Sequence, residues 1–354
     1  MKLEDLGYNT SFERYRQEHQ LENHEIGRVI AEHKERYIVK TVQGEYDAEI
    51  SGNMRFTASG REDFPAVGDW VALISNGIDF AVIHAILPRY SIIKRQAIAR
   101  FGEIQIIAAN VDEAFLIQAV DRDFNINRLE RYLTICHSSR IDPVIILSKI
   151  DLIDSSRLEE IQHSIHERIS DIPVLFVSSQ IQSGYRTVRD YMQPGKTYCM
   201  LGSSGVGKST LLNHLAGRDI MRTGEISSST LKGKHVTSHR ELIILENGGI
   251  LIDNPGMKEV GITDNAEGLE ITFISIAQRS QQCKFKDCTH THEAGCAILE
   301  AVQSGEIDSA SYQNYLRMER EKAHFETTAA ERRKKDKAFG KMLKNYQRDF
   351  KKDK

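Results

Sequence analysis

A glycine-rich loop between a short apolar stretch and a helical segment constrains this chain more than any other feature. The loop consists of Gly202, Ser203, Ser204, Gly205, Val206, Gly207, Lys208, Ser209 and Thr210, which fit the phosphate-binding pattern G-x-x-x-x-G-K-[ST]. Residues 197–201 are predicted to form a buried strand, and residues 208–216 a helix that ends at Gly217. Glycines let the backbone approach a phosphate closely, and the N–H groups at a helix N-terminus attract anions. We expect Lys208 to contact the β- and γ-phosphates and Ser209 to bind Mg²⁺.

Strands and helices alternate from about residue 110 onward. Strands are predicted at 113–120, 144–147, 173–177, 197–201, 242–245 and 250–253, and helices at 126–138, 157–169, 185–192 and 208–216. The last two strands suggest a hairpin across residues 246–249. This alternation predicts a doubly wound, mostly parallel sheet with helices on both faces. Ligands of such sheets bind at the carboxyl ends of the strands.

Three further motifs fall at predicted strand ends. Asp253 begins a D-x-P-G motif, in which the carboxylate is expected to hold Mg²⁺ and the N–H of Gly256 to face the γ-phosphate. The residues Ser148, Lys149, Ile150 and Asp151 are similar to the guanine signature Asn-Lys-x-Asp of GTPases. Asp151 would accept hydrogen bonds from guanine N1–H and the 2-amino group, and Lys149 would cover the base. Ser178 and Ser179 follow the next strand, where GTPases contact the guanine oxygen.

The motifs occur in an unusual order. Ordinary GTPases run from the phosphate loop through D-x-x-G to the base motif, whereas here the base motif at 148–151 precedes the phosphate loop at 202–210. The same sheet can form if the chain is circularly permuted. The order therefore predicts a permuted GTPase domain that is followed directly by a C-terminal region.

The N-terminal part has a different pattern. Residues 1–23 are polar and predicted to be helical, with no function assigned. Five short strands are predicted at 27–31, 37–42, 46–50, 70–74 and 80–87. Five strands in about 70 residues suit a small barrel of the OB type, which often binds nucleic acid. Basic side chains available for phosphates are Arg55, Arg61, Arg89, Lys94 and Arg95; a barrel that contacts only protein is the alternative.

A compact cysteine cluster precedes the C-terminus. Cys283, Cys288, His290 and Cys296 supply three thiolates and one imidazole within 14 residues. Such soft ligands in a short loop suit one closed, tetrahedral, structural Zn²⁺. His292 is an alternative ligand that we expect to be a surface residue. After the cluster, helices are predicted at 298–302 and 311–318.

Charge and hydropathy limit the partners. The net charge is −3, yet residues 320–354 carry 13 Lys or Arg against 6 Asp or Glu, so the remainder has a charge of about −10. A basic tail with interleaved aromatic residues suits RNA, and a solvated helix face is the alternative.

No apolar run approaches the length of a membrane span, and the N-terminus has no secretory pattern. We expect a cytoplasmic protein without membrane partners, and a monomer.

Taken with the permuted order, these motifs resemble the RsgA (YjeQ) family of circularly permuted GTPases that act on the small ribosomal subunit. The resemblance covers roughly residues 24–350, and its carriers include residues 67–71, 125–133 and 253–262 besides the motifs above. It implies a multidomain α/β protein, with an N-terminal OB-type barrel at 24–100 after the extension 1–23. A permuted GTPase domain at 105–262 and a helical zinc-binding domain with a basic tail at 263–354 would follow. It also implies slow GTP hydrolysis that the small subunit stimulates, and a role late in the maturation of that subunit.

Two departures from the family pattern concern the nucleotide site. The base motif begins with Ser148 in place of Asn, which removes an amide and suggests weaker guanine binding. The family's run of switch threonines is reduced to Thr237, our candidate for the contact to Mg²⁺ and the γ-phosphate.

The residue after D-x-P-G is Met257, whose thioether cannot orient a water. The resemblance supports His239 as the catalytic histidine, with His235 as the alternative.

The predicted function is therefore hydrolysis of GTP to GDP and phosphate, with GTP/GDP, Mg²⁺ and one Zn²⁺ as ligands. The expected partners are the small ribosomal subunit and its 16S-type rRNA, and hydrolysis is expected to release the protein from the subunit. An alternative is a ribosome- or RNA-binding protein that uses GTP mainly as a conformational ligand. An ATP-dependent enzyme is a third possibility, which Asp151 disfavours because adenine lacks the matching donors.

Overall fold

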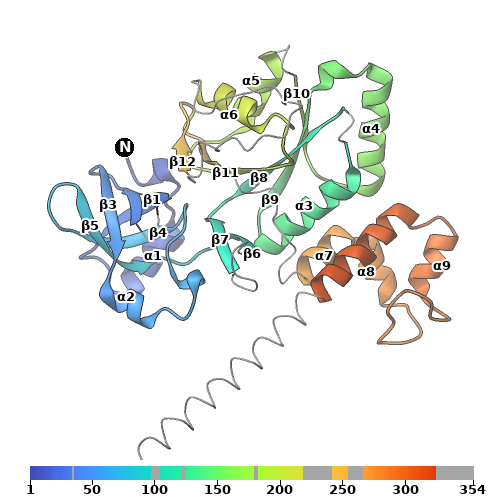
Figure 1. Ribbon diagram of the computed structural model, residues 1–354, viewed down its shortest axis with the longest axis horizontal. Coiled ribbons are helices and arrows are strands. Elements are labelled where there is room, and N and C mark those ends of the chain that lie inside the picture. The colour runs from blue at the N-terminus through green and yellow to red at the C-terminus, as the bar shows by residue number, and fades with distance from the viewer. Residues whose placement is uncertain are drawn as a thin grey trace, which may run out of the picture.

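The computed structural model describes residues 1–33, 36–96, 104–121, 124–178, 182–217, 241–253 and 266–323. Figure 1 shows three bodies in a row: a β-barrel formed by the N-terminal part, a central sheet covered by helices, and a helical C-terminal part. Among the helices in these ranges, none has the length and hydropathy needed to cross a bilayer. The order of elements confirms the predicted multidomain α/β class, whereas the domain limits remain predictions.

The N-terminal barrel is closed. Its strands are β1 (Glu25–His33), β2 (Arg36–Lys40), β3 (Glu45–Ile50), β4 (Trp70–Ser75) and β5 (Phe80–Ile86). They pair in the order β1-β2-β3-β5-β4, and β4 returns to β1. The β3–β5 pair is parallel and the other pairs are antiparallel. All five strands were predicted, and this closed arrangement confirms an OB-type barrel. A short helix, α2 (Gly52–Thr57), was not predicted.

The N-terminal extension packs on the barrel through η1 (Glu4–Leu6) and α1 (Thr10–Glu18). Leu6 and Phe12 are buried against Trp70 of β4. Arg28 of β1, which is 1% exposed, donates hydrogen bonds to the carbonyl oxygens of Leu6 at 2.5 Å, Gly68 at 3.2 Å and Asn110 at 3.0 Å. One buried guanidinium thus joins the extension, the barrel and the start of the central domain.

The contacts of Arg89 correct one expectation about the barrel. Arg89 is not available for phosphates, because it makes a bidentate ion pair with Asp69 at 2.6 and 2.7 Å. It also donates to the carbonyl oxygens of Glu62 and Phe64. Burial raises the pKa of the fully buried Asp69 carboxyl, and the Arg89 guanidinium opposes that shift. Arg89 therefore compensates a buried carboxylate of the barrel, and its removal would leave that charge unpaired.

The central sheet has the predicted architecture. Its strands are β8 (Glu113–Ala119), β9 (Asp142–Ser148), β10 (Val174–Val177), β11 (Thr197–Leu201), β12 (Glu241–Ile244) and β13 (Ile250–Asp253). They lie in the order β10-β9-β8-β11-β13-β12, and only β12 is antiparallel. One residue pair, Ala31 with Glu241, joins β12 to β1 of the barrel. The predicted hairpin between the last two strands is confirmed.

Helices cover both faces of this sheet, as the alternation predicted. They are α3 (Ile126–Ser139), α4 (Ser155–Arg168), α5 (Gln182–Tyr191) and α6 (Lys208–Ala216). α3 and α4 contribute to one apolar cluster, and α5 and α6 contribute to the other. The loops at the carboxyl ends of the parallel strands carry the predicted nucleotide motifs.

A two-stranded ribbon lies between the barrel and the sheet. It consists of β6 (Ile92–Gln96) and β7 (Ile104–Ala109), which pair antiparallel. The ribbon was not predicted, and it crosses the boundary expected between residues 100 and 105. Ile93 and Ile107 are fully buried in the same cluster as α3, so the ribbon packs with the central domain.

The C-terminal part is helical and packs against α3 (Figure 1). It contains α7 (Ala266–Thr272), α8 (Ile274–Ser280), α9 (Ala297–Gln303) and a helix over 309–323. The last two were predicted and the first two were not. Gly268 of α7 is required for this packing, because a Cβ atom there would lie 1.9 Å from the Ser138 hydroxyl and 2.5 Å from the Thr134 carbonyl oxygen.

Candidate nucleotide and metal sites

The glycine-rich loop joins β11 to α6 in the predicted strand–loop–helix setting. Gly202 lies so close to β8 that a Cβ atom would be 2.6 Å from the Ile117 carbonyl oxygen. Gly205 and Gly207 have positive φ values of 81° and 96°. The Lys208 ammonium donates to the carbonyl oxygens of Gly202 at 2.7 Å and Ser203 at 2.6 Å. These features suit a phosphate cradle at a helix N-terminus.

The base motif is held directly against this loop. Ser148, at the end of β9, is buried, and its hydroxyl donates to the Val206 carbonyl oxygen at 2.6 Å and the Gln118 carbonyl oxygen at 3.3 Å. The serine that replaces the expected asparagine therefore links β8, β9 and the phosphate loop. Its hydroxyl contributes a structural contact between the two halves of the candidate site.

Two polar pairs surround the candidate base position. The Asp151 carboxylate accepts a hydrogen bond of 2.6 Å from the hydroxyl of Ser178, which is buried at the end of β10. The Lys149 ammonium forms a 2.9 Å ion pair with Asp121, and Lys149 has a φ of 59°. Each pair joins side chains from the carboxyl ends of neighbouring strands. Asp151 is thereby oriented by Ser178, and the Lys149 ammonium is held by Asp121.

Asp253 ends β13, the strand beside β11, and so lies at the same edge of the sheet as the phosphate loop. The other predicted site residues lie outside the described residues: Ser179, His235, Thr237, His239, Gly256 and Met257. The basic tail beyond residue 323 also lies outside them. Their assigned roles remain predictions.

Sequence reasoning missed Arg128 beside the phosphate loop. Arg128 lies in the first turn of α3, and its guanidinium donates to the Ser203 hydroxyl at 3.1 Å. The available signal was its position, because an arginine just after the end of β8 is carried to the edge of the sheet where ligands bind.

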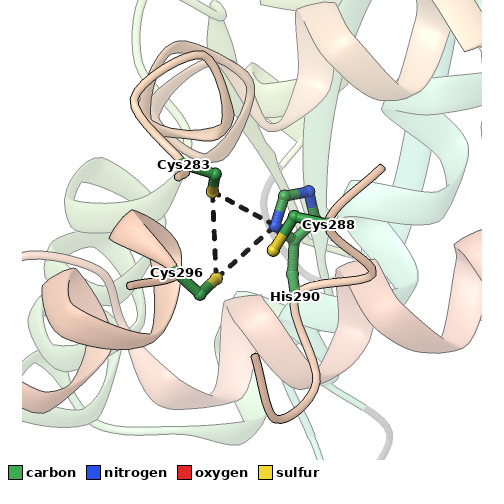
Figure 2. A group of neighbouring side chains, drawn as sticks. All are labelled: Cys283, Cys288, His290 and Cys296. Atoms are coloured by element: carbon green, nitrogen blue, oxygen red, sulfur yellow. Dashed lines mark hydrogen bonds between the residues drawn. The ribbon is translucent and has the colours of Figure 1, made fainter. Parts of the chain in front are cut away.

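The four predicted metal ligands form one cluster (Figure 2). The three sulfur atoms and one nitrogen of Cys283, Cys288, His290 and Cys296 all lie within 4.8 Å of one another. His290 Nδ1 is 3.6 Å from the sulfur atoms of both Cys283 and Cys296, which are 3.9 Å apart. Tetrahedral zinc would place two thiolates about 3.8 Å apart and a thiolate and an imidazole nitrogen about 3.6 Å apart. The cluster can therefore hold one metal ion.

The loop around this cluster is fixed by neighbouring groups. The Tyr312 hydroxyl donates to the His290 carbonyl oxygen at 2.6 Å. The Glu293 carboxylate accepts from the Thr289 hydroxyl and from the N–H groups of Thr289, Thr291 and His292. The hydroxyl bond, together with the N–H bonds from Thr289 and His292, holds the pKa of Glu293 well below its usual range. His292 is exposed and contacts the Thr291 hydroxyl. The geometry favours His290 over His292 as the ligand.

A polar network joins the C-terminal helix 309–323 to α3. Glu130 is 2% exposed and accepts hydrogen bonds from Arg168 at 2.7 Å, Asn314 at 2.6 Å and Ser311 at 3.0 Å. Burial raises the pKa of Glu130, and the Arg168 guanidinium opposes the shift. The next residue of α3, Arg131, makes a bidentate ion pair with Glu321. The metal-site helices are thus attached to the helix that carries Arg128.

Comparison with known proteins decides the family. The sequence profile of the family described as RsgA GTPase matches residues 86–263. A protein of Bacteroides thetaiotaomicron called small ribosomal subunit biogenesis GTPase RsgA 1 is 37% identical over 341 residues, 95% of this chain and 94% of the relative. The chain belongs to the RsgA GTPase family. It is thus a GTP-hydrolysing enzyme with a circularly permuted domain, and the resemblance drawn from the motifs is confirmed.

Other relatives agree with this assignment. The small ribosomal subunit biogenesis GTPase RsgA 2 of Lactiplantibacillus plantarum is 41% identical over 84% of each chain. The crystal structure of YloQ, described as a circularly permuted GTPase, matches with a TM-score of 0.60 and 25% identity, over 89% of this chain and 98% of that one. YjeQ from Thermotoga maritima shares the fold, with a TM-score of 0.62 and 24% identity over 83% of this chain and 96% of that one. An ABC transporter profile also matches residues 185–349, which contain the phosphate loop.

Proposed function

We propose that this GTPase acts in the biogenesis of the small ribosomal subunit, that the subunit stimulates its hydrolysis, and that hydrolysis releases the protein. The observation that carries the proposal is membership of the family, because relatives that match over most of the chain are named small ribosomal subunit biogenesis GTPases. Stimulation by the subunit and release on hydrolysis go beyond those names and are part of the proposal. The permuted sheet with its phosphate loop and base motif supports the nucleotide part of the proposal.

The nucleotide lies along the carboxyl edge of β9, β11 and β13 in this proposal. Asp151, oriented by Ser178, accepts from guanine N1–H and the 2-amino group. The N–H groups of the phosphate loop and the Lys208 ammonium bind the phosphates. Ser209, Thr237 and Asp253 hold Mg²⁺, which would neutralise phosphate charge during phosphoryl transfer. GTP is favoured over ATP because adenine does not offer the donors that Asp151 requires.

The C-terminal region binds zinc and contacts rRNA in this proposal. The three thiolates and one imidazole of Cys283, Cys288, His290 and Cys296 suit zinc better than a metal that prefers oxygen ligands. The barrel, the metal-site helices and the basic tail supply RNA contacts, with Arg55 and Arg61 as the barrel candidates. Lys94 forms a 2.8 Å ion pair with Glu62 and is a weaker candidate.

Hydrolysis needs a residue that orients water, and Met257 cannot do so. We assign this role to His239. His239→Ala should therefore bind small subunits with GTP and remain bound, whereas the unchanged protein dissociates as GTP is consumed. Co-sedimentation with purified small subunits over time measures both. A His239→Ala variant that hydrolyses GTP and leaves the subunit at the unchanged rate would remove His239 from the mechanism and leave His235 as the candidate.

A further inference from the structure

Two cationic groups converge on one residue of the phosphate loop. The Lys208 ammonium donates to the Ser203 carbonyl oxygen at 2.6 Å, and the Arg128 guanidinium donates to the Ser203 hydroxyl at 3.1 Å. The lysine belongs to the loop itself, whereas the arginine comes from α3, 75 residues earlier in the chain. Two cations that meet at a phosphate loop suit a ligand that carries several negative charges.

The backbone that carries Arg128 is held in place. Gln118 of β8 is 1% exposed, and its amide forms two hydrogen bonds with the Asn125 backbone, to the N–H at 2.9 Å and the carbonyl oxygen at 2.8 Å. The Asn125 side chain in turn caps α3 by accepting from the Arg128 N–H at 3.3 Å. Leu129, the next residue, is fully buried. The start of α3 is therefore fixed relative to the loop, and only the Arg128 side chain has to move to reach a phosphate.

We propose that Arg128 is a catalytic residue whose guanidinium contacts the γ-phosphoryl oxygens of bound GTP. This inference rests on the proposed nucleotide site. In the reaction, a water oxygen bonds to the γ-phosphorus while the bond to the bridging oxygen breaks. GDP leaves with the electron pair, and the water proton passes to phosphate or solvent. A planar donor whose backbone is already fixed beside the phosphate loop stabilises the negative charge on the transferring phosphoryl group. Arg128 stabilises this charge but does not orient the water.

The test compares Arg128→Ala and Arg128→Lys with the unchanged protein. We expect Arg128→Ala to lower single-turnover GTP hydrolysis by about 10²- to 10³-fold, the loss typical of removing one donor to developing charge. Its affinity for fluorescent GDP should change little. Capture of GDP with aluminium fluoride, which mimics the transferring phosphoryl group, should be lost. Arg128→Lys should partly restore capture, because it keeps the charge without the planar fork.

The matched control is Arg157→Ala on α4, where the side chain is exposed and paired with Glu160. It should leave hydrolysis, GDP affinity and capture unchanged. Addition of guanidinium ion at millimolar concentration should restore part of the Arg128→Ala hydrolysis, which a purely structural role would not permit. Unchanged hydrolysis and capture in Arg128→Ala would overturn the inference while leaving the nucleotide site intact. Equal losses of GDP affinity and capture would make Arg128 a structural residue of the loop. Failure of the unchanged protein to bind GDP would overturn the nucleotide site itself.

Discussion

Replacing Asp151 with asparagine should lower the affinity for GTP by about 100-fold or more and raise the affinity for xanthosine triphosphate. The carboxylate accepts from two guanine donors, and each charge-assisted hydrogen bond contributes about 1.5–3 kcal/mol. An asparagine amide presents one N–H group toward these donors, so one contact becomes repulsive. Xanthine has a carbonyl in place of the 2-amino group, which accepts from that N–H. Competition between the two nucleotides for the purified protein measures the change.

The control for this substitution is Asp190→Asn, the same chemical change on the exposed face of α5. It should leave both affinities unchanged. If Asp151→Asn retains full preference for GTP, the guanine pocket has been assigned to the wrong loop. The assignment of Ser178 as the group that orients Asp151 would then also fail.

Replacing Cys296 with serine should abolish metal binding and unfold the C-terminal helices. Cys296 is 2% exposed and belongs both to the metal cluster and to the apolar core of that region. A structural zinc contributes about 10 kcal/mol to the folding of a small domain, so the loss of one ligand should be decisive. Zinc content should fall from one per chain to near zero. Hydrogen exchange in 266–323 should accelerate, while the barrel remains protected.

His292→Ala is the matched control, because this exposed histidine lies two residues from the proposed ligand His290. It should retain the zinc and the slow exchange. If His292→Ala loses the metal and His290→Ala keeps it, the ligand set is wrong. If the purified protein contains no metal and its C-terminal helices are still protected, the cluster is held together by its apolar contacts alone.

Local sequence patterns were sufficient for much of this fold. The five barrel strands, the strand–loop–helix around Lys208 and the hairpin before Asp253 each follow from a few consecutive residues. The alternation of strands and helices was also sufficient to predict a mostly parallel sheet, because strands connected through helices lie parallel to one another. The metal ligands could be predicted because they lie within 14 residues, and three cysteines and one histidine so close together are typical of a metal site.

Contacts between distant parts of the chain were not predictable in this way. Arg89 was predicted to be available for phosphates, yet it pairs with Asp69, 20 residues away in the chain. The Glu130–Asn314 bond joins residues 184 apart. The ribbon β6–β7 and the short helices α7 and α8 lack a strong period of their own, and their packing on neighbouring elements determines them. The position of Arg128 after β8 was a local signal, but its contact with Ser203, 75 residues away, could not be predicted from it.

The attachment of the C-terminal region to α3 bears on how the proposed switch works. Arg128 contacts the phosphate loop, and Glu130 and Arg131 of the same helix contact the helix 309–323. This helix therefore connects the proposed nucleotide site with the C-terminal region, which we propose contacts the ribosome. The proposed switch requires that binding to the ribosome change turnover at the nucleotide site.

The most direct measurement is therefore GTP hydrolysis by the purified protein alone, with small ribosomal subunits, and with large subunits as the control. Slow hydrolysis alone, strong stimulation by small subunits and none by large subunits is the result we predict. GTP bound tightly but hydrolysed at the same slow rate in all three samples would contradict the proposed switch. In that case the protein would use GTP mainly as a conformational ligand.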